Sequence, residues 1–307
     1  MKSLLIGTAG WSYPDWAGAV YPSPKRRDFD PLPYLARHFD LVEINASFYR
    51  LPPLRVVESW LRRVDGFPRF RFLFKAPRSW THPGLGAGEP EAPAAAVAEL
   101  AGCLHDAGRL GAVLLQFPWS FRDAPASRAR VDALLRRLEP LPAAVEVRHA
   151  SFARGDWLHW LGERGALPVN VDQPALRDCL PLESATGPDA AYFRLHGRNA
   201  AAWFAASAGR DQRYDYLYAA AELDAIAARV RSAAERVATL FVVTNNHYGG
   251  QAAVNALELR AKLLEERVRV PRSLLARYPQ LAEIATPDSE DGVDDDPTPP
   301  TRQGELF

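Results

Sequence analysis

The fold is decided by the run Ala112-Val113-Leu114-Leu115-Gln116-Phe117, which predicts a buried β-strand. Its central residues are apolar at consecutive rather than alternating positions, so both faces of the strand must be covered. Strands of this kind are typical of parallel sheets that helices cover on both faces. The run also contains a glutamine near its end, and a buried polar group costs free energy unless it is paired. The sequence therefore predicts a parallel sheet with polar groups near its strand ends.

Seven similar runs precede or follow this one, and helical segments separate most of them. The eight predicted strands are Leu4–Thr8, Leu41–Asn45, Phe70–Lys75, Ala112–Phe117, Ala143–Arg148, Leu167–Asp172, Ala191–His196 and Thr239–Asn245. The amphipathic helical segments are Leu54–Val64, Ala92–Ala107, Ser127–Leu138, Gly155–Arg164, Ala219–Arg236 and Gly250–Glu266. Eight β units with intervening helices predict an α/β fold of the (β/α)8 TIM-barrel type, with a doubly wound open sheet as the alternative.

Composition divides the chain into a long body and a short acidic tail. Of the 307 residues, 48% are hydrophobic and 24% are charged, as in ordinary globular proteins. We expect one TIM-barrel domain over residues 1–284 and a disordered acidic linker over residues 285–307. The segment Thr286–Thr301 is rich in Pro, Asp and Ser and has too few apolar residues to offset the entropy of ordering.

The charge distribution excludes one class of function. The chain has 37 basic and 37 acidic residues, but the tail holds seven acidic residues and one basic residue. The body therefore has 36 basic and 30 acidic residues. Such a small excess excludes a histone-like polybasic protein, but it is compatible with a local anion-binding site.

The cysteines and the N-terminus indicate in which cellular compartment the protein is expected. Cys103 and Cys179 lie far apart and form no CxxC pattern, which disfavours a zinc ribbon or a thioredoxin-like site. Two lone thiols suit a reducing cytosol. The apolar run after Met1 is too short for a signal peptide, and no segment approaches the roughly 20 apolar residues of a membrane span. We expect a cytoplasmic protein with no membrane partner.

Polar and aromatic residues gather where the predicted strands end, which is where TIM barrels bind their ligands. The predicted ligand-binding residues are Trp11, Tyr13, Asn45, Tyr49, Arg78, His82, Gln116, Arg148, His149, Asp172, Arg194, His196, Arg198, Asn245 and Asn246. Tyr214, Tyr216 and Tyr218 alternate after the seventh strand, and they either line the rim or form one packed face. The aromatic residues of the first two loops either stack on a ligand or close the mouth of the barrel as a small core.

The residue types suggest the chemistry of this site. Arginine and lysine side chains together with amides suit the oxygens of a phosphate or carboxylate ligand. Glu43 and Glu146 are candidates for an acid/base pair, and Lys75 is the third candidate catalytic residue. The alternative is that these three neutralise one another inside the barrel. The histidines lack the HxH or HExxH spacing of a metal site, so no metal ligand is predicted. The sequence does not indicate which cofactor, if any, the protein uses.

Taken together, the motifs resemble those of a known family. They are Gly7-Thr8-Ala9-Gly10-Trp11-Ser12-Tyr13, Val42-Glu43-Ile44-Asn45-Ala46-Ser47-Phe48-Tyr49-Arg50, Phe74-Lys75-Ala76-Pro77-Arg78, Thr81-His82, Leu115-Gln116-Phe117-Pro118, Val145-Glu146-Val147-Arg148-His149, Arg194-Leu195-His196-Gly197-Arg198 and Asn245-Asn246. The set resembles the YecE-like family, a family of unknown function, over about residues 3–265. The resemblance implies a TIM barrel but no settled reaction. Ala9 and Ala46 stand where the family usually has serine, which argues against a serine nucleophile there.

The last five residues suggest a partner. Gln303-Gly304-Glu305-Leu306-Phe307 resembles the Gln-x-x-Leu-Phe peptide by which bacterial DNA polymerases and repair proteins bind the sliding clamp. Gln303, Leu306 and Phe307 would be the partner-binding residues, with a flexible tether presenting two apolar side chains to a pocket. The alternative is a tail that folds back on the body or has no role.

These observations lead to one functional hypothesis with two alternatives. The chain is expected to be an enzyme or a binding protein for an anionic ligand that carries phosphate, nucleic acid included, and to be recruited to DNA replication or repair by its C-terminal peptide. The first alternative is a sugar-active isomerase or hydrolase unconnected with DNA. The second is a non-catalytic binding module. The sequence does not decide between catalysis and binding.

Overall fold

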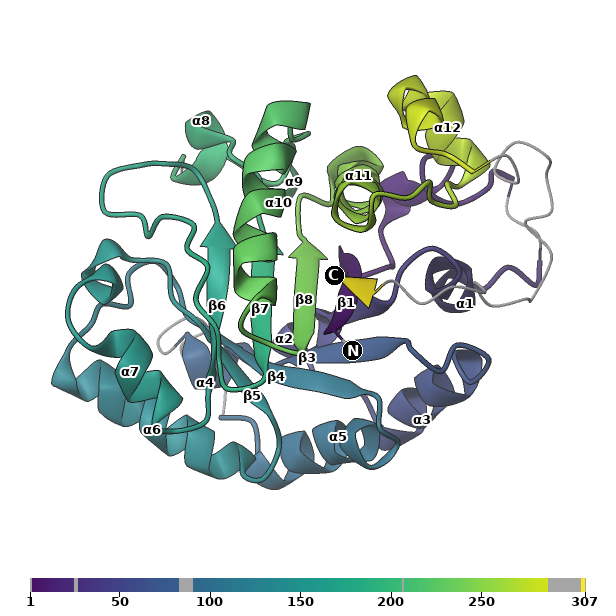
Figure 1. The fold of residues 1–307 in the computed structure, drawn as a ribbon. Coiled ribbons are helices and arrows are strands. Elements are labelled where there is room, and N and C mark those ends of the chain that lie inside the picture. Colours follow the sequence, from purple (N-terminus) through teal and green to yellow (C-terminus); the bar gives the residue numbers. More distant parts are fainter. Residues whose placement is uncertain (1, 25–26, 83–90, 206, 287–304, 307) are drawn as a thin grey trace.

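Eight parallel strands form a closed barrel (Figure 1). The computed structural model describes residues 2–24, 27–82, 91–205, 207–286 and 305–306. The strands of the barrel are β1 (Lys2–Ala9), β2 (Leu41–Ile44), β3 (Arg71–Lys75), β4 (Leu110–Gln116), β5 (Ala143–Glu146), β6 (Leu167–Asp172), β7 (Ala190–Leu195) and β8 (Thr239–Thr244). Each pairs in parallel with the next, and β1 pairs with both β8 and β2. The predicted TIM barrel is confirmed, and the open-sheet alternative is wrong.

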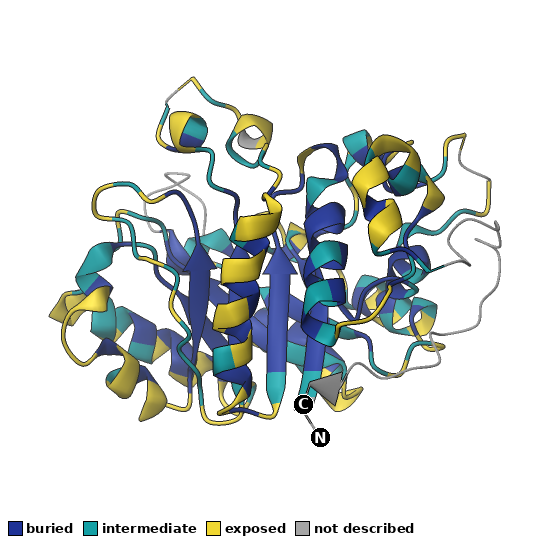
Figure 2. Cartoon of the chain, turned by 45° about the horizontal axis from the view of Figure 1, so that its top comes forward, coloured by how far each residue is buried: buried dark blue, intermediate teal, exposed yellow. Residues whose placement is uncertain are grey.

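Helices surround the barrel (Figure 1), and Figure 2 shows their buried residues on the side of the strands. Apolar side chains of the helices and of the strands pack together there. The longer ones are α3 (Leu54–Arg63), α5 (Ala94–Asp106), α6 (Pro125–Leu138), α7 (Trp157–Gly162), α10 (Ala220–Ala234) and α11 (Gln251–Leu264). Each lies within a predicted helical segment or extends it by two residues. In all of them except the six-residue α7, the spacing of apolar residues continues over two or more turns, which makes it detectable in the sequence.

Shorter helices lie in the connections, where the sequence analysis placed none. They are η1 (Pro14–Trp16), α1 (Pro31–Ala36), α2 (Ala46–Tyr49), α4 (Arg78–Thr81), η2 (Ala150–Ala153), α8 (Ala200–Trp203), α9 (Arg210–Arg213), η3 (Tyr248–Gly250), α12 (Arg272–Arg277) and η4 (Pro279–Glu283). With six residues or fewer, none shows a usable helical period. Several follow the C-terminal ends of strands, so they shape the mouth of the barrel.

One glycine allows the barrel to close. Gly7 of β1 pairs with Leu41 of β2. A Cβ atom at this position would lie 1.8 Å from the carbonyl oxygen of Leu41. Any larger residue would push the two strands apart, so this contact requires glycine. Leu73, Phe241 and other apolar side chains fill the interior below the mouth.

The C-terminal region continues past the last long helix. Ala285 is buried and pairs with Val268, and the Thr286 amide donates to the Val268 carbonyl at 2.9 Å. The packed body thus includes two residues that composition places in the tail. Most of the predicted linker lies outside the described residues, as do Gln303 and Phe307.

Two residues of the predicted clamp-binding peptide are described. Glu305–Leu306 forms strand β9, whose backbone pairs antiparallel with Lys2 and Ser3 of β1. Figure 1 shows this strand beside the start of β1, at the end of the barrel opposite the predicted site. Clamp binding stays a prediction. Within the described ranges, no helix is long and apolar enough to cross a lipid bilayer.

Candidate functional site

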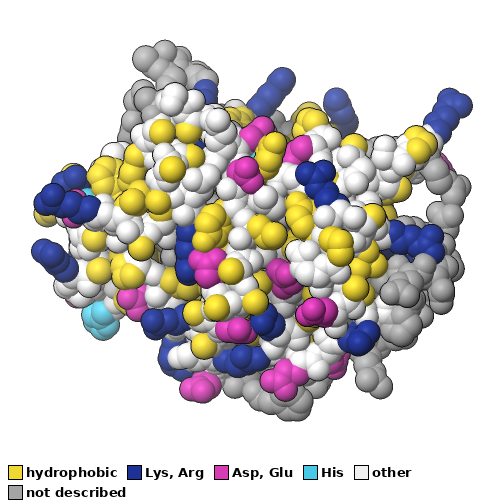
Figure 3. Space-filling model, turned by 90° about the horizontal axis from the view of Figure 1, so that it is seen from above, with side chains coloured by type: hydrophobic (Ala, Val, Ile, Leu, Met, Phe, Trp, Pro, Cys, Tyr) yellow, Lys and Arg dark blue, Asp and Glu magenta, His cyan; other side chains and the backbone are white. Residues whose placement is uncertain are grey.

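A cavity of about 500 Å³ opens at the C-terminal ends of the strands, on the face that Figure 3 shows from above. We call it the mouth pocket. Its walls come from the segments that follow β1, β2, β3 and β8 and from the end of α9. The lining residues are Gly10, Trp11, Ser12, Tyr13, Asn45, Ala46, Tyr49, Lys75, Arg213, Tyr214, Asn245 and His247.

A cluster of charged groups lies inside the barrel. Arg194 of β7 donates through Nε and Nη2 to the two carboxylate oxygens of Glu43 at 2.8 and 2.6 Å, and through Nη1 to Glu146. Tyr192 donates its hydroxyl to Glu43 Oε2 at 2.7 Å. All four side chains are fully buried. We call these four residues the lumen cluster, in which hydrogen bonds satisfy both carboxylates.

Two further side chains hold Glu146. Arg148 Nε donates to its Oε1 at 2.8 Å, and His196 Nε2 lies 3.2 Å from the same oxygen. Asn245 Nδ2 lies 2.9 Å from His196 Nδ1, and Arg148 Nη2 lies 3.2 Å from His196 Nε2. Burial, with Arg148 nearby, lowers the pKa of His196 to about 3, and the ring is neutral near pH 7.

The electrostatics fix the charge of the lumen cluster. Burial raises the pKa of Glu146, but Arg194 and Arg148 outweigh it and hold that pKa well below its usual range. Burial likewise lowers the pKa of Arg194, and the two glutamates outweigh it. A glutamate held ionised in this way is a poor general acid at neutral pH. The acid/base roles predicted for Glu43 and Glu146 stay predictions, and neither residue lines the mouth pocket.

Lys75 ends β3 and faces the mouth pocket. Its Nζ lies 4.0 Å from the centre of the Phe48 ring. Across the described ranges, Nζ makes no hydrogen bond or ion pair. Burial, followed by the charge of Arg194, lowers the pKa of Lys75 to about 7, although Glu43 and Glu146 oppose the shift. The neutral amine is therefore far more populated near pH 7 than in an ordinary lysine, whose pKa is about 10.4.

The segment after β2 sets the position of Lys75. Ser47 is fully buried, and its hydroxyl makes hydrogen bonds to the carbonyls of Ile44 at 3.0 Å and Lys75 at 2.6 Å. These bonds join the start of α2 to the end of β3, and α2 places the Phe48 ring against Lys75 Nζ. Asn45, the residue before α2, lines the mouth pocket.

Two buried polar atoms of the mouth pocket have no hydrogen-bond partner in the described part of the chain. They are Asn45 Oδ1, an acceptor, and Arg213 Nε, a donor. Buried polar atoms are paired in most folded proteins, so each exception needs an explanation. Both residues line the pocket, although these two atoms are themselves shielded from solvent.

Aromatic side chains form another part of the pocket wall. Tyr13 stacks on the His247 ring with their centroids 4.4 Å apart, and Tyr214 lies 5.3 Å from the same ring. Tyr49 is 65% exposed at the edge. The packed Tyr13–His247 pair supports the mouth-closing interpretation. The Tyr49 ring meets the Phe48 ring edge-on, with centroids 5.1 Å apart, and its exposed surface is available for stacking on a ligand.

A second polar network lies beside the pocket. Arg198 donates to Asp172 at 2.9 and 2.5 Å and to Glu222 at 2.9 Å, while the Tyr218 hydroxyl donates to Asp172 at 2.6 Å. The Tyr216 hydroxyl donates to Glu222 at 2.8 Å. Asp172 and Arg198, both predicted to bind ligand, are thus paired with each other and lie outside the pocket lining.

The structure separates the predicted site residues into two groups. Those in the pocket lining are Trp11, Tyr13, Asn45, Tyr49, Lys75 and Asn245. Those outside it are Glu43, Arg78, His82, Gln116, Glu146, Arg148, His149, Asp172, Arg194, His196, Arg198 and Asn246. Arg213 was missed because it follows no strand and belongs to no periodic segment. Tyr214, His247 and Ser12 also line the pocket without having been assigned to the ligand.

Several residues outside the lining have local partners. Gln116 donates to the Phe117 carbonyl at 2.9 Å, and Asn246 donates to Asn255 Oδ1 at 2.8 Å. His82 contacts Thr81 at 2.9 Å, and burial, followed by Lys75, lowers its pKa to about 4. Within the described ranges, no group of three or more His, Cys, Asp or Glu residues has an arrangement that could hold a metal ion.

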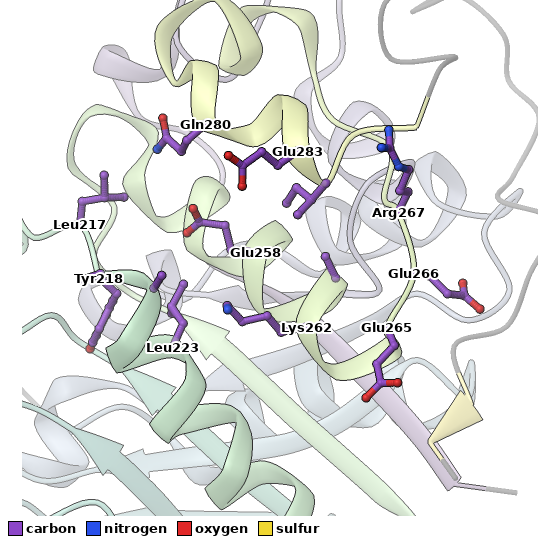
Figure 4. A pocket seen from close by; sticks show the side chains of 14 residues that line it. Leu217, Tyr218, Leu223, Glu258, Lys262, Glu265, Glu266, Arg267, Gln280 and Glu283 are labelled. Carbon is purple, nitrogen blue, oxygen red and sulfur yellow. The ribbon is translucent and has the colours of Figure 1, made fainter.

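A second cavity, of about 600 Å³, lies on the outside of the barrel between α10, α11 and η4 (Figure 4). Figure 4 shows Glu258, Glu265, Glu283 and Lys262 around it. Its carboxylates outnumber its basic groups, and it lies away from the strand ends. It therefore lacks both features that recommend the mouth pocket.

Comparison with known proteins identifies the family that this chain matches. The sequence profile described as "Protein of unknown function DUF72" matches residues 5–280. The UPF0759 protein YunF of Bacillus subtilis is 28% identical over 285 residues, which cover 88% of this chain and 99% of YunF. The UPF0759 protein YecE of Escherichia coli O157:H7 is 32% identical over 189 residues, 59% of this chain and 61% of YecE.

Solved structures give the same result. The crystal structure of a DUF72 family protein from Thermotoga maritima has a TM-score of 0.75 and 36% identity, covering 86% of this chain and 100% of the other. A DUF72 family protein from Enterococcus faecalis has a TM-score of 0.72 and 26% identity, covering 84% and 94%. The predicted YecE-like resemblance is confirmed. The names of these relatives state no ligand or reaction.

Proposed function

The chain belongs to the DUF72 family, and we propose that it binds a small anionic molecule, one that carries phosphate or carboxylate, in the mouth pocket. One observation carries the proposal. Two basic side chains, Lys75 and Arg213, line the pocket, while none of its described lining residues is Asp or Glu. An anion would pair with them where no protein carboxylate competes.

The neighbouring networks explain why these cations remain available. Arg194 forms ion pairs with Glu43 and Glu146, and Arg198 forms ion pairs with Asp172 and Glu222. The carboxylates of the lumen cluster and of the Arg198 network are thus already paired. Arg213 lines the pocket, and a guanidinium offers donors suited to an anionic oxygen.

The size of the cavity favours a small ligand. About 500 Å³ lies within the range of small-molecule pockets. Figure 3 shows basic, acidic and hydrophobic side chains interspersed on this face, without a continuous basic surface among the coloured residues. A long nucleic acid requires such a surface along its backbone, so a nucleotide-sized or smaller anion fits better.

Calorimetric titration with a matched pair of ligands tests the proposal. Glycerol 3-phosphate and glycerol differ by the phosphate group, and we expect the phosphate ester to bind at least tenfold more tightly. Arg213→Gln should lower its affinity about tenfold, since charge-assisted hydrogen bonds contribute about 1.5–3 kcal/mol.

The control is Arg136→Gln. Arg136 lies on α6, is 73% exposed and pairs with Asp132 at 2.8 Å, so the change removes the same charge away from the pocket. It should leave the affinity unchanged. Equal affinities for glycerol and glycerol 3-phosphate would refute the proposal and favour the neutral-sugar alternative.

A further inference from the structure

We infer that Lys75 is a nucleophilic amine that forms an imine with a carbonyl group of the bound anion. The ligand would then be an aldehyde or ketone that also carries phosphate or carboxylate. The anionic half of this inference rests on the proposed function, whereas the carbonyl half rests on Lys75 itself.

The position of Lys75 is the first argument. It ends β3 at the C-terminal mouth, where TIM-barrel enzymes carry their reacting groups. Its side chain lines the pocket, so a ligand there can reach Nζ. The Phe48 ring contacts Nζ, and the Ser47 hydroxyl donates to the Lys75 carbonyl, so contacts at both ends of the residue fix its position.

The absence of a counter-ion is the second argument. Arg194 binds both glutamates of the lumen cluster, and Nζ pairs with no acid in the described part of the chain. Burial and the charges of Arg194 and Arg148 disfavour the ammonium form, the glutamates oppose them, and His82 beside it is neutral at pH 7. The resulting neutral amine has the lone pair that attack on a carbonyl requires.

The residue type is the third argument. Only four of the 37 basic residues are lysines: Lys2, Lys25, Lys75 and Lys262. Arginine fills the other basic positions of the site, namely 148, 194, 198 and 213. Arginine supplies charge but does not lose its proton at neutral pH. A lysine at position 75 is therefore suited to a task that needs a neutral amine.

The step is balanced without an oxidant or reductant. The Nζ lone pair forms a bond to the carbonyl carbon, and the π electrons move to the oxygen, which takes up a proton. The carbinolamine then gives up its N–H proton and its hydroxyl group as one molecule of water, and a C=N bond forms. Asn45 lines the same pocket, and its side-chain amide is available to form a hydrogen bond with the carbinolamine hydroxyl.

Reductive trapping tests the inference on the full-length protein. Glycolaldehyde phosphate and glycolaldehyde carry the same aldehyde with and without phosphate, and cyanoborohydride reduces an imine to a stable secondary amine. After limited labelling at pH 7, peptide mass spectrometry should find Lys75 modified at least tenfold faster than Lys262. Lys262 is a surface lysine paired with Asp224 at 2.6 Å and serves as an internal control. An ordinary lysine, with a pKa near 10.4, is about 0.04% neutral at this pH.

Variants separate the two halves of the inference. Lys75→Arg keeps the charge and should abolish labelling at this site, with its fold checked by thermal unfolding. Arg213→Gln should slow labelling by glycolaldehyde phosphate about tenfold and leave labelling by glycolaldehyde unchanged. Labelling of Lys75 no faster than that of Lys262, by either aldehyde, would overturn the inference.

The two proposals can fail separately. Tight binding of glycerol 3-phosphate without preferential labelling of Lys75 would leave the anion proposal standing and refute imine formation. Lys75 could also be labelled rapidly and at equal rates by both aldehydes, while glycerol 3-phosphate does not bind. That result would support the nucleophilic role of Lys75 and refute anion binding in the mouth pocket.

Discussion

The lumen cluster and the mouth pocket both carry basic side chains, but their surroundings differ. Arg194 in the lumen cluster has carboxylate partners for Nε and for both terminal nitrogens. Lys75 in the pocket wall has no carboxylate partner within the described ranges, only the ring of Phe48. The two cations belong to neighbouring parts of one barrel, yet only the first is neutralised by the protein.

This difference separates structure from function. A buried charge whose hydrogen bonds are complete stabilises the fold it belongs to, because removing one partner leaves the other unpaired. A charge that the protein leaves without a counter-ion costs free energy in the empty pocket, and a ligand can repay that cost. Polar residues at strand ends therefore need to be sorted by whether the protein satisfies them.

The largest effect should come from Arg194→Met. The change leaves Glu43 and Glu146 buried without their arginine, and breaking such a pair costs about 3–5 kcal/mol. Urea denaturation should show this loss in the free energy of unfolding. Arg136→Gln removes an exposed arginine whose ion pair is worth at most about 1 kcal/mol. Similar losses for the two variants would remove the distinction between the lumen cluster and the surface.

Lys75→Met should raise the free energy of unfolding, whereas Arg194→Met lowers it. The pKa of Lys75 is about 7 in the folded chain against an ordinary 10.5, so between these values the unfolded chain binds a proton that the folded chain does not. Wild-type stability therefore rises with pH from 7 to 10.5. The methionine variant should be more stable at pH 7 by about 1–3 kcal/mol, after a discount for partial exposure.

The pH dependence is the decisive measurement. The gain from Lys75→Met should be present at pH 7 and below, and it should shrink as the pH rises toward 10.5, where the lysine of the unfolded chain also becomes neutral. Urea denaturation at pH 7, 8.5 and 10 measures it. A gain that stays constant over this range would mean that packing, rather than charge, accounts for the change.

Asn45→Ala should have a smaller effect, lowering ligand affinity without lowering stability. Its Oδ1 is buried without a hydrogen-bond partner in the described ranges, so removal should leave the stability of the empty protein unchanged or raise it by up to about 1 kcal/mol. Affinity for glycerol 3-phosphate should fall about fivefold, as expected for one lost hydrogen bond. A stability loss with unchanged affinity would assign Asn45 to the fold.

The sequence predicted the barrel because the relevant signals are local. Apolar runs such as Ala112–Phe117 and the helical spacing between them are visible within a single element. The polar strand ends were visible for the same reason. The depth at which each polar side chain lies was not, because Glu43 and Asn45, two residues apart, reach the lumen cluster and the mouth pocket respectively.

The remaining site features depend on contacts between distant residues. The bond between Arg194 and Glu43 joins residues 151 positions apart, and its formation depends on barrel closure and strand register. Arg213 lies at the end of a four-residue helix in a long connection, where neither strand nor helix periodicity gives a signal. Sequence reasoning could therefore find the strand-end residues but could not tell paired ones from unpaired ones.

The smallest effect on either region should come from deleting residues 303–307. In the described part of the chain, strand β9 pairs with Lys2 and Ser3, at the end of β1 remote from the mouth pocket. The deletion should leave affinity for glycerol 3-phosphate unchanged, which provides a baseline for the pocket variants. The predicted clamp-binding role of Gln303, Leu306 and Phe307 makes a separate claim: the full-length chain binds a bacterial sliding clamp with micromolar Kd, and the deletion variant does not. Equal clamp binding by both, or none by either, would refute that role, while a loss of ligand affinity would show that the two ends of the barrel are coupled.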